Sequence, residues 1–462
     1  MVLPLVLGCV NVVSLPEGLA FKGEERPANR VRFLTDLTWV NDAGDRQTDQ
    51  VIFDEIFRLI RGARKFVLMD MFLYNDFQGA EPERHRALAA EMTTLLIERK
   101  QAIPGLEIIL ITDPVNTVYG GLASKHFTFL LDHGITVVET NLDVLRDSNP
   151  CYSLPWRLLV KPFGNTAGGL VANPFGEGRV SIRSWMRMIN FKANHRKTLV
   201  VDDGDTVTGL VTSANPHDGS SAHRNAAVVF SGQAALDLAK SEYPVLEMSG
   251  TAVPDFVPAA VPAIEDALYR LQVLTEIRIK EEVLQLIEET QHGDSIDLVL
   301  FYLSERRVIT ALKAAHRRGV RLRIVLDPNK DAFGWKKNGV PNRPVAKELH
   351  GAGITVRWSD THGEQGHGKT MIVRWTRGDT ALLVGSANFT RRNLDNLNLE
   401  TSVLVLGPSE SELGVTVRTY FERIWNNEPG RTFTVDYETY RDHSVLKTFL
   451  YRVQEATGMS TF

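Results

Sequence analysis

The sequence is poor in cysteine, carries little net charge and has no long apolar run. Only two of its 462 residues, Cys9 and Cys151, are cysteines, which excludes a disulfide scaffold and a zinc site built from cysteines. A net charge of −4 gives no general attraction to nucleic acid, so any anion site must be local. No apolar run reaches the roughly 18 residues that a transmembrane helix needs. The composition, 43% hydrophobic and 23% charged, is that of a globular chain long enough for two domains.

The N-terminus is apolar but lacks the basic region of a secretory signal. The four residues ending at Cys9 loosely resemble a bacterial lipoprotein processing box, although no Lys or Arg precedes them. A loose leader or a first buried strand is the alternative. We expect residues 1–30, which contain Pro16, Gly18, Gly23 and Pro27, to form an irregular leader.

Two segments of the chain resemble each other. Each holds a His, a Lys two residues later and an apolar run, and each reaches an Asn 20 or 21 residues after the His, in a turn of small residues. These residues are His195, Lys197, Ser213 and Asn215 in the first segment, and His367, Lys369, Ser386 and Asn388 in the second. Asp-Pro at 113 and 327 and Gly-Ile-Thr at 134 and 353 repeat as well. The sequence therefore predicts an internal duplication of roughly 200 residues, far longer than a solenoid repeat.

Apolar runs typical of strands alternate with helical patterns in both copies. This alternation predicts two α/β halves with mostly parallel or mixed sheets covered by helices. We place the first half at 31–248, a proline-containing linker at 249–262 and the second half at 263–462. Two equivalent halves commonly pack about a pseudo-twofold axis, which would bring the two motif histidines face to face.

The halves differ by an insertion of about 47 residues in the first, predicted as a long loop at 145–190. From residue 150 to 197 the chain carries eight Lys or Arg against one acid, together with several aromatic residues. A segment of this length inside a compact domain is usually functional. The mixture suits lipid headgroups and equally suits a polyanionic substrate, and a simple lid is the alternative. We expect Arg183 and Trp185 of this loop to contact the substrate.

The repeated residues suit phosphodiester chemistry. Histidine can be neutral or protonated near pH 7, so one His can attack while the other donates a proton to the leaving oxygen. Each Lys lies two residues after its His, on the same face of a strand, where it can hold a phosphate oxygen. The Ser and Asn residues of the two turns can supply further donors at the pocket edge. No acidic metal cage accompanies the set, so we expect neither a metal nor another cofactor.

The pattern His-x-Lys-x-x-x-x-Asp followed by Gly-Ser-x-Asn, present twice, resembles the phospholipase D superfamily, in particular its bacterial cardiolipin synthase-like members. The first copy keeps Asp202 but has Thr212 where the family has Gly. The second keeps Gly385 but has Arg374 at the Asp position. The resemblance implies two α/β halves, each a mixed β-sheet flanked by helices, with the active site between them.

The resemblance also implies the residue roles. It makes His195 the nucleophile and His367 the acid. Glu400 lies 12 residues after Asn388, where the family places a carboxylate that orients its own His. Ala227 is the counterpart by counting, so His195 lacks that partner unless Asp218 or another group substitutes. A carboxylate raises the pKa of a histidine, which fits His367 as the proton donor.

The sequence thus predicts an enzyme that hydrolyses or transfers phospholipid phosphodiesters through a phosphohistidine. It predicts a phospholipid partner with peripheral membrane contact, disfavours nucleic acid and indicates no obligate protein partner. We expect the protein to be soluble or peripheral at the cytoplasmic side of a bacterial membrane, with anchorage through Cys9 as the alternative. A metal-independent nuclease of the same superfamily and a non-catalytic binding protein are the rival functions.

Overall fold

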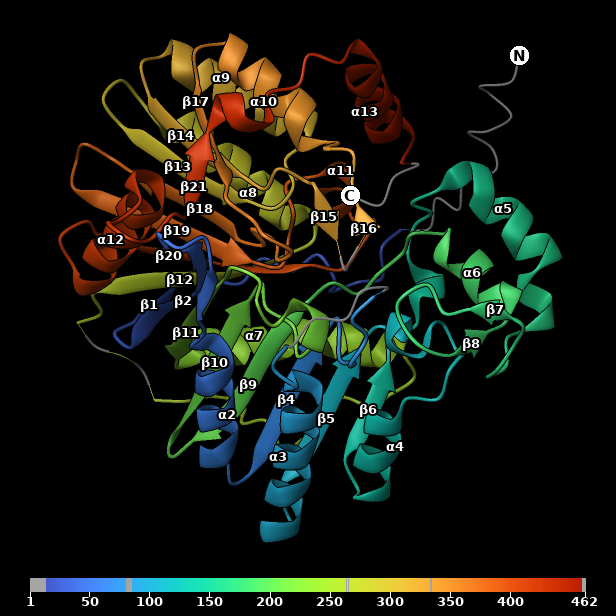
Figure 1. Cartoon of the computed structure of the whole chain (residues 1–462). Helices are drawn as coiled ribbons and strands as arrows, with labels where there is room; N and C mark the ends of the chain where they lie inside the picture. The colour runs from blue at the N-terminus through green and yellow to red at the C-terminus, as the bar shows by residue number, and fades with distance from the viewer. Residues whose placement is uncertain (1–13, 80–84, 263, 265, 333–334, 459–462) are drawn as a thin grey trace.

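The protein consists of two mixed β-sheets, each covered by helices and lying one above the other in Figure 1. The computed structural model describes residues 14–79, 85–262, 264, 266–332 and 335–458. Seven strands of one sheet follow the same spatial order as seven strands of the other, with the same parallel and antiparallel pairings. The predicted fold class, two duplicated α/β halves, is therefore confirmed.

The first sheet has eight strands, and its centre is a run of residues buried on both faces, Phe66–Met71. A strand buried on both faces needs packing partners on both sides of the sheet. The helical segments that alternate with the strands along the sequence provide helices for this purpose. The strands, in spatial order, are β3 (Arg46–Asp49), β2 (Val31–Val40), β11 (Asn225–Ser231), β10 (Thr206–Thr212), β9 (Lys197–Asp203), β4 (Phe66–Met71), β5 (Glu107–Thr112) and β6 (Thr136–Glu139). The helices of this half are α2 (Ile52–Gly62), α3 (Leu88–Ala102), α4 (Lys125–Asp132) and α7 (Gln233–Met248), with short 3-10 turns η1 (Pro114–Thr117), η2 (Leu142–Val144) and η4 (Asp218–Ser220).

The second sheet repeats this arrangement with nine strands. In spatial order they are β1 (Arg26–Ala28), β12 (Tyr269–Thr275), β20 (Thr401–Pro408), β19 (Asp379–Gly385), β18 (Lys369–Arg374), β13 (Ser295–Leu300), β14 (Arg321–Leu326), β17 (Thr355–Ser359) and β21 (Thr434–Asp436). Its helices are α8 (Ile277–Glu289), α9 (Arg306–Arg317), α10 (Asn342–Gly351), α11 (Arg391–Leu394), α12 (Glu412–Asn426) and α13 (Val445–Thr457), with η5 (Tyr437–Tyr440) and the small hairpin β15 (Asp331–Ala332) and β16 (Trp335–Lys336).

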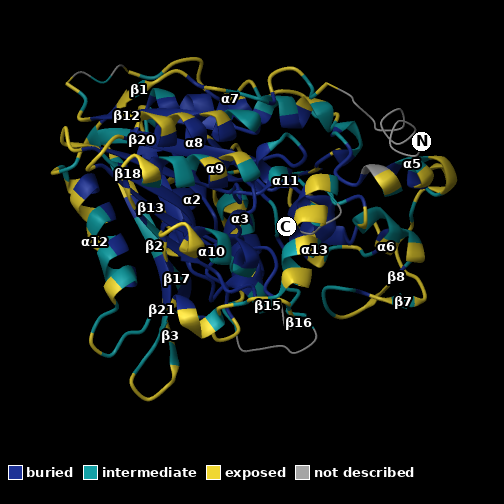
Figure 2. Ribbon diagram, turned by 90° about the horizontal axis from the view of Figure 1, so that it is seen from above, coloured by how far each residue is buried: buried dark blue, intermediate teal, exposed yellow. Residues whose placement is uncertain are grey.

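One apolar cluster is shared by the two halves, and each half also has a cluster of its own. Residues from β9, β10 and β11 belong to the same buried cluster as residues from β18, β19 and β20, and Figure 2 shows this centre in dark blue. The chain also crosses between the halves, because β1 of the N-terminal segment pairs with β12 of the second sheet. The segment predicted as an irregular leader therefore contains a strand, while Cys9 and the lipoprotein-like sequence lie outside the described residues.

The insertion at 145–190 is not the long loop that the sequence predicted. It folds into a small projecting unit with two short helices at the right of Figure 1. The unit comprises α5 (Pro150–Leu159), η3 (Lys161–Phe163), the hairpin β7 (Val171–Ala172) and β8 (Arg179–Val180), and α6 (Ile182–Met188). None of the helices in the described part of the chain has the length and apolar character to cross a bilayer.

Candidate active site

The two motif histidines precede equivalent strands, β9 and β18, and are fixed there by equivalent aspartates. Asp113, at the end of β5, accepts hydrogen bonds from the backbone N–H of Val115 and, at 2.7 Å, from that of Asn194. Asp327, at the end of β14, accepts the N–H of Gly366 at 2.8 Å. Each aspartate therefore caps a strand end and also holds the residue before the histidine. The repeated aspartates thus fix the backbone just before each histidine, where the chain enters the strand.

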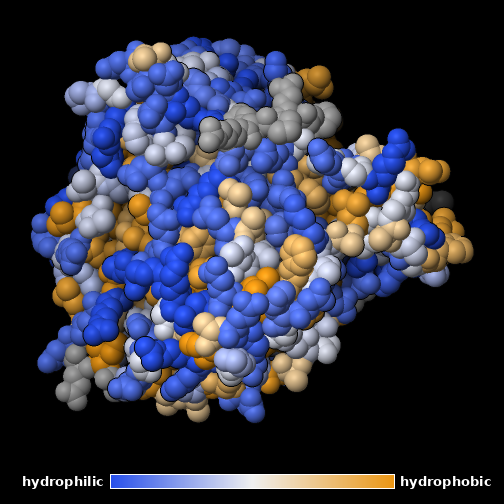
Figure 3. Space-filling view, turned by 60° about the horizontal axis from the view of Figure 1, so that its bottom comes forward, coloured by the Kyte–Doolittle hydropathy of each residue, from blue (hydrophilic) through white to orange (hydrophobic). Residues whose placement is uncertain are grey.

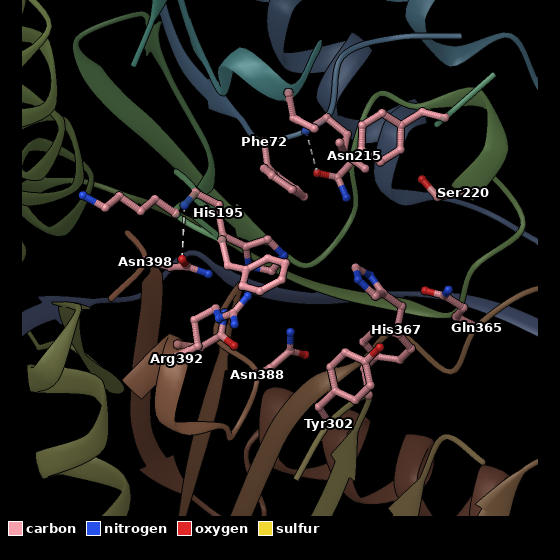
Figure 4. A pocket seen from close by; sticks show the side chains of 18 of the residues that line it. Phe72, His195, Asn215, Ser220, Tyr302, Gln365, His367, Asn388, Arg392 and Asn398 are labelled. Atoms are coloured by element: carbon pink, nitrogen blue, oxygen red, sulfur yellow. Dashed lines mark hydrogen bonds between the residues drawn. The ribbon is translucent and has the colours of Figure 1, made fainter. Parts of the chain in front are cut away.

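Both histidines line one cavity of about 370 Å³ between the halves. Asn215 and Asn388 line the same cavity and turn their amide nitrogens toward it (Figure 4). The insertion contributes Phe175 and Met188 to the wall. The remaining lining residues are mainly aromatic, basic or amide-bearing: Phe72, Leu73, Val115, Tyr119, Phe191, Lys192, Ala193, Ser220, His223, Phe301, Tyr302, Lys337, Gln365, Arg392, Asn393 and Asn398.

The carboxylate of Glu400 binds the histidine of the opposite half. The Glu400 oxygens lie 2.9 and 3.0 Å from Nδ1 of His195. The contact arises because the segment before β9 pairs with the segment before β20, with the backbone N–H of His195 donating to the carbonyl of Leu399 at 2.9 Å. The expectation that Glu400 orients His367, leaving His195 without a carboxylate partner, is therefore wrong.

His367 has a neutral partner, also from the opposite half. Its Nδ1 lies 3.0 Å from Oδ1 of Asn225. Counting twelve residues from Asn215 gave Ala227, but the strand pairing gives a different equivalence. Thr212 pairs with Ala227, whereas its equivalent Gly385 pairs with Ser402, so Ala227 corresponds to Ser402 and not to Glu400. The turn after Asn215 is two residues shorter than its counterpart, so Asn225 occupies the position equivalent to Glu400.

Ser213 and Ser386 were predicted to bind substrate, but the structure places both behind the histidine partners. The Ser213 hydroxyl donates to Oδ1 of Asn225 at 2.9 Å, and the Ser386 hydroxyl donates to Glu400. Both serines are fully buried and neither lines the cavity. Their equivalent contacts show that the small-residue turns position the groups that orient the histidines.

Burial dominates the acid–base properties of the site. It lowers the pKa of His195 to about 4, although the carboxylate of Glu400 acts in the opposite direction. Burial opposes ionisation of Glu400 too, but His195 and Lys197 hold its pKa below the usual value. Burial and the nearby cation of Lys369 lower the pKa of His367 well below the usual range. Both imidazoles are therefore neutral near pH 7 in the empty site, with Nδ1 donating to Glu400 or Asn225 and Nε2 unprotonated.

The motif lysines lie beneath the histidines. Nζ of Lys197 donates to the carbonyl of His195 at 2.5 Å, and Nζ of Lys369 donates to the carbonyl of His367 at 2.7 Å. Burial lowers the pKa of Lys197 to about 7 and that of Lys369 well below its usual value. The lysine charges repel each other, so an anion that binds between them gains two cationic donors. In the described part of the chain, no cluster of three or more His, Cys, Asp or Glu is placed to hold a metal ion.

The predicted substrate contacts of the insertion have no support in the geometry. Arg183 donates to the carbonyl of Phe163, and the indole N–H of Trp185 donates to that of Ala172. Neither side chain lines the cavity between the histidines. The insertion reaches the cavity through Phe175 and Met188 instead, which carry no charge and gave no chemical signal in the sequence.

Arg196, between the motif histidine and lysine, has a function that the sequence did not suggest. Its fully buried guanidinium pairs with Glu242 at 2.9 Å in the first half and with Glu276 at 2.8 Å in the second. Glu276 in turn accepts the backbone N–H of Glu400 at 3.0 Å. The arginine therefore links the two halves directly behind His195 and Glu400.

The motif Asp202 lies at the far end of β9, away from the cavity. Its carboxylate accepts the backbone N–H groups of Arg64, Lys65 and Phe66. At the equivalent end of β18, Arg374 pairs with Asp297. The substitution of Asp by Arg in the second copy thus changes strand-end pairing and leaves the cavity intact.

Comparison with known proteins agrees with this geometry. Residues 283–425 match the family model of the phospholipase D-like domain of cardiolipin synthase. The chain is 29% identical over 203 residues to human mitochondrial cardiolipin hydrolase, covering 44% of this chain and 67% of that protein. The mouse protein of the same name is 27% identical over 194 residues, covering 41% of this chain and 72% of that protein.

The fold agrees as well. The crystal structure of phosphatidylserine synthase from Haemophilus influenzae superposes with a TM-score of 0.54 over 93% of this chain and 94% of that chain, at 12% identity. That similarity establishes the two-half architecture. The duplicated His-x-Lys segments, the cavity between them and the sequence matches support the assignment of the chain to the phospholipase D superfamily, as a phospholipase D-like phosphodiesterase or transferase.

Proposed function

We propose that the protein cleaves or exchanges the headgroup ester of a phospholipid through a covalent phosphohistidine on His195. The observation that carries this proposal is the unequal pairing of two histidines on one cavity, His195 with the carboxylate of Glu400 and His367 with the amide of Asn225. A nucleophilic imidazole becomes cationic when its Nε2 bonds to phosphorus. An anion at Nδ1 stabilises that cation, and a neutral amide does not.

The first step forms one bond and breaks one. Nε2 of His195 attacks phosphorus while the bond between phosphorus and the headgroup oxygen breaks. The leaving oxygen takes the proton from Nε2 of His367. Lys197, Lys369, Asn215 and Asn388 stabilise the charge on the non-bridging oxygens.

The second step reverses these movements. Neutral His367 accepts a proton from water or from a second alcohol as its oxygen attacks phosphorus, and the bond between phosphorus and His195 breaks. Water gives hydrolysis, and an alcohol gives transfer. The acid of the first step is thereby the base of the second, and it ends the cycle protonated.

His367 takes up its proton from solvent when the anionic substrate binds. In the empty site burial and neighbouring cations hold the pKa of His367 well below its usual value. A phosphodiester anion between the two lysines offsets their repulsion, which favours the imidazolium. A neutral partner leaves that imidazolium a stronger acid than a carboxylate partner would.

Membrane contact is proposed for the insertion. Leu159, Phe163 and Leu170 expose between 71% and 88% of their surface, and Arg157, Lys161 and Arg183 lie among them. Figure 3 shows hydrophobic and hydrophilic residues side by side on the projection at its right. Apolar side chains among basic ones suit the boundary of an anionic bilayer better than a nucleic-acid backbone. The same unit lines the cavity through Phe175 and Met188, so it can deliver lipid to the histidines.

The test offers mixed anionic liposomes and single-stranded DNA side by side to wild type and to His195→Ala, in EDTA. We expect headgroup release from lipid by wild type only, and a new phosphatidyl ester when a primary alcohol is added. Release of nucleotides without lipid turnover would make the protein a nuclease of the superfamily. Equal lipid turnover by His195→Ala would refute the mechanism.

A further inference from the structure

We propose that His223 is a further catalytic residue, whose Nε2–H donates a hydrogen bond to the leaving oxygen while His367 protonates that oxygen. His223 lies just before β11 in the first half and lines the cavity. The choice of the leaving oxygen rests on the proposed function, because that function places the acid at His367. The tautomer of His223 rests on its own contacts.

His223 is a neighbour of His367 across the boundary between the halves. The centres of the two rings are 5.6 Å apart, and their planes are inclined by 58°. Asn225, two residues after His223, contacts Nδ1 of His367 from the same half. The first half therefore presents two side chains to the imidazole of His367, an amide at Nδ1 and a second imidazole beside the ring.

A backbone contact fixes the tautomer of His223. The backbone N–H of Gln365 donates to Nδ1 of His223 at 3.3 Å. A backbone amide nitrogen can only donate, so Nδ1 carries no hydrogen and Nε2 carries one. Burial lowers the pKa of His223 well below its usual value, which opposes a second proton on the ring. His223 is therefore a neutral donor at Nε2, and it does not replace His367 as the acid.

The second half contains the equivalent contact. Asn398 corresponds to His223, because each lies two residues before the side chain that contacts Nδ1 of the opposite histidine. The backbone N–H of Ala193 donates to Oδ1 of Asn398 at 3.1 Å, and Figure 4 shows this oxygen turned toward the N–H. In both halves the accepted N–H lies two residues before a motif histidine, and the accepting side chain lines the cavity. The duplication thus places a side chain that accepts there and can donate elsewhere beside each motif histidine.

The two donors meet different parts of the reaction. In the proposed mechanism phosphorus bonds to His195, whereas the leaving oxygen lies at His367. Negative charge develops on that oxygen as its bond to phosphorus breaks, and a fixed N–H donor stabilises the charge. His367 supplies the proton and His223 keeps its own hydrogen. A neutral donor suits this place, because a second imidazolium would lower the pKa of His367 further.

The activity test compares two short-chain phosphatidyl esters of equal charge that differ only in the leaving alcohol, ethanol or p-nitrophenol. The nitrophenolate is a stable anion, whereas the ethanol oxygen needs stabilisation. We expect His223→Leu to lose about a hundredfold in kcat/KM on the ethyl ester and less than about fivefold on the nitrophenyl ester. His223→Asn, which carries the side chain of its counterpart, should recover most of the lost activity. Equal losses on both esters, or none on either, would overturn the proposal.

The matched control is Asn398→Leu, on the side of His195. This variant removes the equivalent contact away from the leaving oxygen, so any loss should be the same on both esters. A loss that depends on the leaving alcohol in Asn398→Leu and not in His223→Leu would make His195 the acid. That result would overturn the assignment of His223 together with the proposed roles of the histidines.

A measurement without turnover separates this inference from the proposed function. In protein labelled with ¹⁵N-histidine, the signals of His223 are those that His223→Asn lacks. At pH 7 we expect a hydrogen on Nε2 and none on Nδ1, and we expect inorganic phosphate to shift the Nε2 signal. A hydrogen on Nδ1, or an Nε2 signal that phosphate leaves unchanged, would overturn the proposal even if lipids are cleaved. The expected signals in a protein that cleaves neither ester would refute the proposed function alone.

Discussion

At the scale of single residues, His195 and His367 occupy equivalent places and have chemically different partners. Glu400 contacts the first and Asn225 the second, and each partner comes from the other half. The sequence identified both histidines and the carboxylate. It could not pair them, because the pairing joins residues 205 and 142 positions apart and depends on how the sheets face each other. Counting twelve residues from Asn215 gave Ala227 and missed Asn225, because the turn of the first half is two residues shorter than that of the second.

The first prediction concerns pH. The mechanism needs His367 protonated, and the pKa of His367 in the free enzyme lies well below its usual value, so kcat/KM should already fall at acid pH and continue to fall as pH rises. Asn225→Asp places a carboxylate at Nδ1, which favours the imidazolium and raises its pKa. The protonated acid then persists to higher pH, so the fall should move upward by about one to two pH units. The measurement is kcat/KM between pH 5 and 9. An unmoved profile, together with a downward shift in Glu400→Gln, would instead make His195 the acid.

The second prediction distinguishes positioning from substrate binding at Ser386. Its hydroxyl contacts Glu400 and does not line the cavity. Ser386→Ala should therefore lower kcat by about tenfold with little change in KM, because it loosens the carboxylate that orients His195. Ser213→Ala should act in the same way through Asn225. A raised KM with unchanged kcat would restore the substrate-binding role that the sequence suggested.

At the scale of elements, hydrophobic periodicity predicted most helices and strands of both halves. The apolar run at 66–71 forms the buried strand β4, and the helical pattern before it forms α2. The insertion was the exception. Pro155 lies inside one of its helices and its connections are rich in glycine, so the local sequence predicts a loop. The order of the unit comes from packing against the first half.

The third prediction concerns the insertion. Leu159→Asp with Phe163→Asp should abolish sedimentation with anionic liposomes, because both side chains are exposed by 71% and would enter the bilayer boundary. Turnover of a short-chain monomeric lipid should change little, because neither residue lines the cavity. The control is Phe129→Asp, at an exposed position on α4 in the body of the first half. Unchanged sedimentation of the double variant would make the unit a lid without a membrane role.

At the scale of the whole molecule, two equivalent backbone hydrogen bonds connect the halves next to the motif histidines. The backbone N–H of His195 donates to the carbonyl of Leu399, and the backbone N–H of Arg224 donates to the carbonyl of Gln365. Each hydrogen bond joins a segment that contains or precedes a motif histidine to the other half. The sequence predicted a pseudo-twofold arrangement, because a duplicated motif needs a shared site. It did not predict that one apolar cluster would span both halves or that Arg196 would join Glu242 to Glu276.

The fourth prediction tests that link. Arg196→Met leaves two buried carboxylates without their cation, which should lower the free energy of unfolding by about 3–5 kcal/mol. Arg58→Met removes an exposed partner of Glu55 and should cost less than about 1 kcal/mol. Thermal unfolding of the two variants measures the difference. Equal midpoints would show that the buried pairs do not hold the halves together.

The central claim is that His195, with Glu400 behind it, is the nucleophile, and trapping the covalent intermediate tests it most directly. A phosphodiester substrate with a p-nitrophenol leaving group needs no proton from His367, so His367→Ala should form the adduct and fail to activate water. We predict that rapid quenching and peptide mass spectrometry place the phosphoryl group on the His195 peptide in wild type and, at higher occupancy, in His367→Ala. His195→Ala should carry none. An adduct on His367 in wild type or in His195→Ala would contradict the account.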